Sequence, residues 1–152
     1  MKKSFVFVIC MLLLVQFILP VSATAATDND LIYREETILE NGLTVVDEIY
    51  ANKLSRASVI TGERKKTIKS GDTTLGIIAF QATFRYDGSN VAVVSKTVTQ
   101  SDAYEGYSYK QNSFTSSGGT VTLEGKLTKL LIFNQAFTMS LMCDINGNLS
   151  AA

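Results

Sequence analysis

Hydrophobic and polar residues alternate along much of this chain, most clearly over residues 75–86. Ile78, Phe80 and Phe84 fall on one face of that segment, while Gln81 and Arg85 fall on the other. Strict alternation is typical of a half-buried β-strand. The same period predicts further strands over residues 64–69, 91–99, 107–116, 120–127 and 133–145. No helical periodicity of useful length follows the first 25 residues, so the pattern predicts an all-β domain.

Short turn signals separate these segments. Asn41-Gly42 lies between two β-prone runs, 37–40 and 43–50, and this dipeptide strongly favours a hairpin because both residues tolerate positive φ. Residues 51–62 lose the alternation and predict a linker. Strands and turns that recur about every ten residues indicate a two-sheet antiparallel sandwich, immunoglobulin-like, over residues 60–152. Residues 26–59 are then an N-terminal extension made of the hairpin and the linker. The predicted core comprises Ile78, Phe80, Phe84, Val91, Val93, Val121, Leu123, Phe137, Met139 and Leu141.

The N-terminus carries a different pattern. Lys2 and Lys3 precede an uncharged, almost unbroken apolar run over residues 4–19, and Pro20 ends it. Ala23-Thr24-Ala25 then supplies small residues at the spacing that signal peptidase needs. The sequence therefore predicts a signal peptide helix over residues 1–25, cleaved after Ala25. We expect a secreted, extracellular protein with no transmembrane segment in its mature chain.

Composition narrows the function classes. Without Lys2 and Lys3, 12 basic residues face 14 acidic ones, a balance that argues against a nucleic-acid binder. There is no histidine, which excludes Ser-His-Asp and Cys-His mechanisms and histidine-ligated zinc. Glu35-Glu36 and Asp47-Glu48 are adjacent in sequence, so the two members of each pair point to opposite faces of a strand. We therefore predict no catalytic residues, no cofactor and no metal.

Cys10 leaves with the signal peptide, which makes Cys143 the lone cysteine of the mature chain. Its apolar neighbours favour a buried free thiol, and an intermolecular disulfide is the alternative. Asp144 to Asn148 contains residue types that ligate calcium, but the spacing differs from that of an EF-hand, and we expect a turn there.

Two clusters are candidates for surface binding. Arg64, Lys65, Lys66 and Lys69 form the one dense basic run of the sequence, and they suit a cell-wall polyanion or another anionic surface. Solubilisation and protection of a sheet edge is the alternative interpretation of these charges. Tyr104, Tyr107 and Tyr109 gather around Gly106, either as core residues or as an exposed aromatic surface.

Three short motifs carry a resemblance. They are Ser55-Arg56-Ala57-Ser58, Phe84-x-Tyr86-x-Gly88, and Cys143-x-x-Asn146-Gly147. With them, residues 36–150 resemble small, uncharacterised secreted β-rich proteins of Gram-positive bacteria. Such proteins often have a second cysteine in the strand after the Gly88 turn, and residues 91–94 here contain none. The resemblance implies secretion and a β-rich fold, but no particular activity.

The expectation from sequence is thus a secreted, non-enzymatic β-sandwich module that binds or assembles at the bacterial cell surface. A secreted bacteriocin-like effector and a hydrolase that uses carboxylates alone are the alternatives. Sandwich folds host many functions, so the fold does not decide between them.

Overall fold

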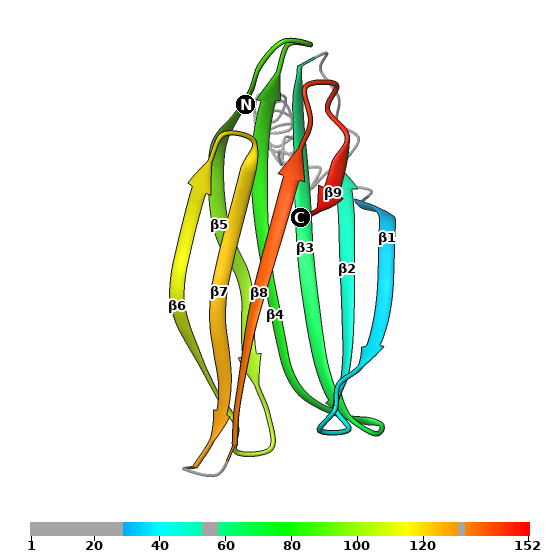
Figure 1. Ribbon diagram of the computed structural model, residues 1–152, viewed down its shortest axis with the longest axis vertical. Helices are drawn as coiled ribbons and strands as arrows, with labels where there is room; N and C mark the ends of the chain where they lie inside the picture. The colour runs from blue at the N-terminus through cyan, green and yellow to red at the C-terminus, as the bar shows by residue number, and fades with distance from the viewer. Residues whose placement is uncertain (1–28, 53–57, 131–132) are drawn as a thin grey trace, which may run out of the picture.

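The computed structural model describes residues 29–52, 58–130 and 133–152, which form strands and turns and contain no helix. The predicted signal peptide lies outside these residues. The all-β, antiparallel two-sheet architecture predicted from the alternation is confirmed (Figure 1). The strands are β1 (Asn29–Ile38), β2 (Thr44–Asn52), β3 (Val59–Ser70), β4 (Thr73–Tyr86), β5 (Val91–Ala103), β6 (Ser108–Ser117), β7 (Thr120–Lys129), β8 (Phe133–Cys143) and β9 (Leu149–Ala151).

Sheet A has the order β1-β2-β3-β4-β5, and sheet B has the order β6-β7-β8-β9. Within each sheet, strands that are consecutive in sequence lie side by side, and described connections such as residues 39–43 and 71–72 are short turns. Gly42 (φ 79°) and Gly71 (φ 56°) supply the left-handed conformation that two of these turns need. Immunoglobulin domains instead place non-consecutive strands side by side through Greek-key connections. The immunoglobulin-like part of the prediction therefore does not extend to the strand order.

The two sheets pack face to face around one hydrophobic core (Figure 1). Seven of the ten predicted core residues are fully buried, and Val91, Val93 and Phe137 are partly buried against them. Ile49, Ile68 and Leu127 also belong to the core and are less than 2% exposed. Two of these come from β2 and β3, so the N-terminal strands contribute to the core.

The N-terminal hairpin is continuous with sheet A. Strand β2 pairs with β3 from Thr44↔Lys69 to Asn52↔Thr61. The predicted linker over residues 51–62 is therefore shorter than expected at both ends, because main-chain pairing continues where side-chain alternation has faded. Residues 53–57 lie outside the described part.

Sheet A is wider than sheet B on the side of β1. Strand β9 pairs with β8 only from Leu141 to Cys143, and it lies near the upper end of β2 (Figure 1). Below β9, strand β8 is the last strand of sheet B. The inner faces of β1 and β2 therefore extend past the edge of the second sheet, and the polar cluster described next lies there.

Candidate functional site

The predicted basic cluster is divided between the two faces of β3. Arg64 and Lys66 point toward sheet B, whereas Lys65 points the other way and lies 3.8 Å from Glu48 on the outer face. Lys69 follows a bulge at the end of β3 and is half-buried. The four side chains do not form one continuous patch, because successive residues of a strand alternate between faces.

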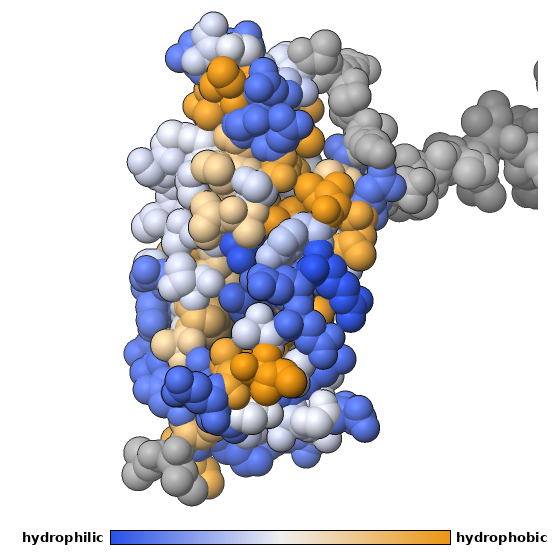
Figure 2. Space-filling view, turned by 45° about the vertical axis from the view of Figure 1, so that its right-hand side comes forward, coloured by the Kyte–Doolittle hydropathy of each residue, from blue (hydrophilic) through white to orange (hydrophobic). Residues whose placement is uncertain are grey.

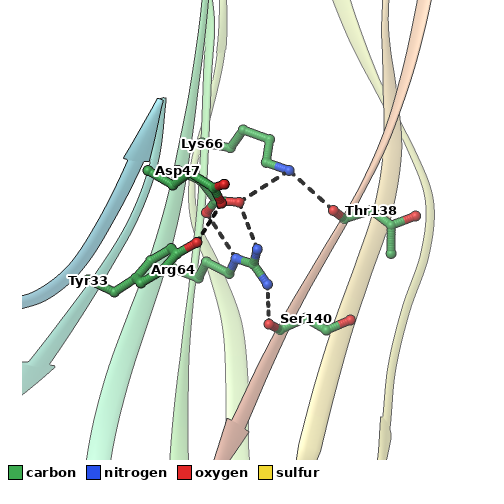
Figure 3. A network of polar contacts seen from close by, with 7 residues as sticks. Tyr33, Asp47, Arg64, Lys66, Thr138 and Ser140 are labelled. Carbon is green, nitrogen blue, oxygen red and sulfur yellow. Dashed lines mark hydrogen bonds and ion pairs between the residues drawn. The ribbon is translucent and has the colours of Figure 1, made fainter. Parts of the chain in front are cut away.

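Arg64 forms a buried bidentate ion pair with Asp47 of β2 (Figure 3). Its Nε donates to Oδ1 at 3.0 Å and its Nη2 donates to Oδ2 at 2.7 Å. The two side chains are only 8% and 12% exposed. Arg64 also donates through Nη1 to the main-chain oxygen of Ser140 on β8. One guanidinium thus neutralises a buried carboxylate and ties sheet A to sheet B.

Lys66 repeats this arrangement one pleat further along β3. Its Nζ lies 3.4 Å from Asp47 Oδ2 and donates to the main-chain oxygen of Thr138 at 3.2 Å (Figure 3). Burial lowers the pKa of Lys66 from its ordinary value, and the carboxylate of Asp47 opposes that shift.

The main-chain oxygens that these two bases bind lie on the side of β8 that faces away from β7. The Ser140 oxygen also accepts from Ala152 N–H at 3.2 Å, whereas Thr138 lies below β9, where this edge is open. Alternate residues of an antiparallel strand direct their main-chain groups to opposite sides. Cys143 N–H donates to the main-chain oxygen of Gly119, the residue just before β7. The main-chain groups of the even-numbered residues of β8 therefore point away from β7. Arg64 and Lys66 therefore cap this edge from inside the fold, in the manner of charged residues that block edge-to-edge pairing.

A groove of about 300 Å³ opens between this edge and the first three strands of sheet A. Val45 and Ile68 line it together with Glu35, Asp47 and Lys66. Glu35 and Asp47 are directly opposite each other in the β1–β2 register, so carboxylates from different strands meet on one face. Each is already engaged within the fold, Asp47 by Arg64 and Lys66, and Glu35 by Tyr33 Oη at 2.5 Å.

The predicted tyrosine cluster is also divided. Tyr104 is 41% exposed in the connection between the sheets. Tyr107 is half-buried, with its ring edge-on to Phe133 and the ammonium of Lys129 4.8 Å from its centroid. Tyr109 stacks on Phe137 with the ring centroids 6.0 Å apart. Two of the three tyrosines thus pack against the core, and Tyr104 is the exposed one.

Tyr109 is exceptional because of its hydroxyl. Among the described residues, its Oη is the one buried side-chain polar atom that lacks a hydrogen-bond partner. Burial also raises the pKa of Tyr109 above its ordinary value. Gly125 leaves room for the ring, since a Cβ there would lie 2.8 Å from it.

Cys143 is a free thiol, only 2% exposed. Burial raises its pKa to about 11, with a smaller contribution from the Asp144 carboxylate. The predicted turn at Asp144 is present, and its carboxylate accepts from the main chains of Asn146 and Asn148 and from the Asn148 side chain. In the described part of the chain, no group of three or more acidic or cysteine residues could hold a metal ion.

Strand β1 is much longer than the β-prone run 37–40 that the sequence predicted as the first arm of the hairpin. It forms the edge of sheet A, and Leu31, Ile32 and Ile38 on it are 48%, 45% and 75% exposed. Figure 2 brings this side of the molecule forward and shows hydrophobic groups separated by charged ones. The signal in the sequence was the run of apolar residues 31–33 ahead of the hairpin, which the strand prediction left out.

The comparisons found no protein-family model, no curated protein and no solved structure that matches this chain. A helix long and apolar enough to cross a membrane is absent from residues 29–52, 58–130 and 133–152.

Proposed function

We propose that this protein is a secreted, non-enzymatic module that binds or assembles at the bacterial cell surface. The observation that carries the proposal is the contrast between its buried charges and its exposed edge. Arg64, Lys66 and Asp47 are engaged with one another and with the edge of β8. Strand β1, in contrast, exposes three large apolar side chains along an open sheet edge.

Such an arrangement suits recognition better than chemistry. A catalytic acid, base or nucleophile needs an accessible reactive atom beside a space for substrate. The acidic groups of the groove instead bind partners from their own fold, and Cys143 is buried with its pKa raised to about 11. An exposed apolar edge on an extracellular β-domain is the kind of surface through which proteins associate.

Export is tested first. Expression in a Gram-positive host should release the protein into the medium, and N-terminal sequencing should begin at Ala26. Protein retained whole in the cytoplasm would overturn the proposal.

Surface binding is tested by sedimenting the exported protein with intact Gram-positive cells and with isolated cell wall, at low and high salt. Salt-sensitive binding should fall when Lys65 and Lys69 are both replaced by glutamine. Salt-resistant binding should depend on exposed apolar and aromatic groups such as Tyr104, tested by Tyr104→Ala. Lys96→Gln is the matched charge control, because Lys96 is engaged with Phe114. No binding at either salt concentration would overturn the surface role.

A further inference from the structure

The described strands present a small number of sheet edges, and most are closed by side chains. Arg64 and Lys66 cap the edge of β8. On the other side of the molecule, β5 of sheet A lies against β6 of sheet B, and Lys96 Nζ donates to the main-chain oxygen of Phe114 at 2.8 Å. Lysine on an edge prevents pairing with another chain.

No described lysine or arginine from sheet B caps the edge of β1 over its regular part, Tyr33 to Ile38, which follows a bulge after Leu31. Strand β2 is the one described strand that pairs with β1, so no described strand pairs with its outer side. Leu39 accepts from Gly42 N–H and donates to Leu43 at 2.8 Å, so its main-chain groups face β2. The main-chain groups of successive strand residues point to opposite sides. Those of Arg34, Glu36 and Ile38 therefore point to the open edge.

The side chains on this edge are self-complementary. Strand β1 is regular from Tyr33 to Ile38, below a bulge between Leu31 and Tyr33. If a second β1 runs antiparallel with Glu35 on the twofold axis, Arg34 lies opposite Glu36 of the other copy. Arg34 and Glu36 occur twice, so the contact carries two pairs of opposite charge about its axis, and the exposed Ile38 of each copy lies beyond them. Shifting the register by two residues either way would place Arg34 opposite Arg34, or Glu36 opposite Glu36.

The atoms needed for these pairs are available. Arg34 has a side chain that is 54% exposed although it also contacts Glu48. Glu36 is exposed and forms no ion pair with the residues that the structure describes. The facing Arg34 and Glu36 residues would exchange about four main-chain hydrogen bonds across the axis. Arg34 and Glu36 thus offer both their main-chain groups and their opposite charges to the second copy.

We propose that β1 pairs with β1 of a second copy of this chain, antiparallel and with Glu35 on the twofold axis. The two five-stranded sheets then continue into one another. This inference deepens the proposed function, since it names the partner of the exposed edge. A closed twofold contact of this kind gives a dimer, not a fibre.

The dimer should be weak. An interface made by one short strand edge is smaller than the area of about 1,200–2,000 Å² that stable complexes bury, and we expect a dissociation constant of roughly 10–100 µM. Analytical ultracentrifugation of the exported protein from about 5 to 500 µM is the appropriate measurement. A monomer throughout that range would overturn the inference.

Charge reversal tests the partner and the register together. Arg34→Glu should weaken dimerisation at least about tenfold, because two attractive pairs become repulsive. Arg34→Glu combined with Glu36→Arg should restore it to within about threefold. Both variants lose the ion pair between position 34 and Glu48 within the chain. Restored dimerisation in the double variant would therefore be due to the contact between copies. Weak association in both variants, with unchanged circular dichroism, would overturn the register.

Two further variants sharpen the test. Glu35→Gln removes like charges that face each other at the axis and should tighten the dimer about threefold. Glu35→Cys should give a disulfide-linked dimer on mild oxidation, since facing residues that are not hydrogen-bonded lie about 4.5 Å apart at Cα. Glu36→Cys, which lies off the axis, should not crosslink to itself.

Val94→Thr is the matched apolar control. Val94 is 52% exposed on β5, the other edge of sheet A. Ile38→Thr should weaken the dimer about threefold and Val94→Thr should leave it unchanged. The opposite result, or open-ended filaments, would place the contact at β5 and overturn the inference. A monomer that still binds cell wall would overturn this inference alone, whereas a dimer without wall binding would overturn the surface role alone.

Discussion

Replacing Arg64 by methionine removes the guanidinium that neutralises Asp47 and leaves an apolar side chain of similar length. Removing one partner from a buried ion pair costs about 3–5 kcal/mol because the other charge stays desolvated. Asp47 retains Lys66 at 3.4 Å, and its side chain is 12% exposed, so the lower end, about 3 kcal/mol, applies. Ser140 retains the N–H of Ala152 at 3.2 Å, which limits the loss at the β8 edge.

Urea denaturation followed by circular dichroism and tyrosine fluorescence measures this loss. With a urea dependence of about 1–3 kcal/mol per molar, the midpoint should fall by roughly 1–3 M. Lys65→Met is the matched control because Lys65 is the next residue of the same strand and faces outward, 3.8 Å from Glu48. It should cost less than about 1 kcal/mol. Equal losses for the two variants would refute the inward placement of Arg64.

A second variant separates the ion pair from packing. Asp47→Asn removes the buried negative charge, so Arg64→Met in that background should cost less than it does in the wild-type chain. The difference between the two costs is the coupling energy of Arg64 and Asp47, and we expect at least about 1.5 kcal/mol. A coupling energy near zero would mean that Arg64 stabilises the fold through its aliphatic stem and not through Asp47.

Three other positions give direct tests. Tyr109→Phe should raise the free energy of unfolding by up to about 1 kcal/mol in urea melts, because it deletes an unpaired buried hydroxyl; a loss of more than about 1 kcal/mol would show that the hydroxyl has a partner. The Cys143 thiol should resist Ellman's reagent at about pH 8 until the protein unfolds. Because its pKa of about 11 lies above the ordinary 9.0, the unfolded chain releases this proton first, so stability should be full below about pH 9 and fall by roughly 2 kcal/mol toward about pH 11. Cys143→Ala should remove that part of the fall, and an unchanged pH profile would contradict the shift. Leu130→Gly should raise the melting temperature, since Leu130 has a φ of 51° and is 81% exposed, and relief of a left-handed leucine is worth about 1 kcal/mol; a lower melting temperature would contradict this account.

Much of the fold could be predicted from the sequence because its strands alternate strictly where one face meets the core. The predicted segments at Ile78 and Met139 correspond to β4 and β8, and the turn at Asn41-Gly42 is where expected. Prediction was weaker in the first two strands. Charged residues occupy the inner face there beside Ile49, so the alternation that identifies a buried face was interrupted.

The polar cluster was harder to predict because its members are distant in sequence. Asp47 and Arg64 are 17 residues apart and lie on neighbouring strands, and the register that joins them depends on the length of the β2–β3 connection. Alternation alone could have placed Arg64 and Lys66 on one face and Lys65 on the other. Alternation could not show that the face with Arg64 and Lys66 is the one toward sheet B, because basic residues are ordinarily expected in solvent.

The edges of the two sheets connect these observations. A fold made of successive hairpins with unequal sheets must expose the last strand of each sheet, and each unpaired edge invites another chain. Buried bases solve this problem at β8, where Arg64 and Lys66 bind main-chain oxygens from inside the fold. Mutating them should therefore do more than unfold the protein. A folded variant with a free β8 edge would gain a second site for strand pairing, and its association would no longer stop at a dimer. Filament growth by Lys66→Ala at concentrations where the wild-type chain forms closed pairs would separate the two edges experimentally. Continued dimerisation without filaments would mean that the groove itself, and not Lys66, keeps other strands from β8.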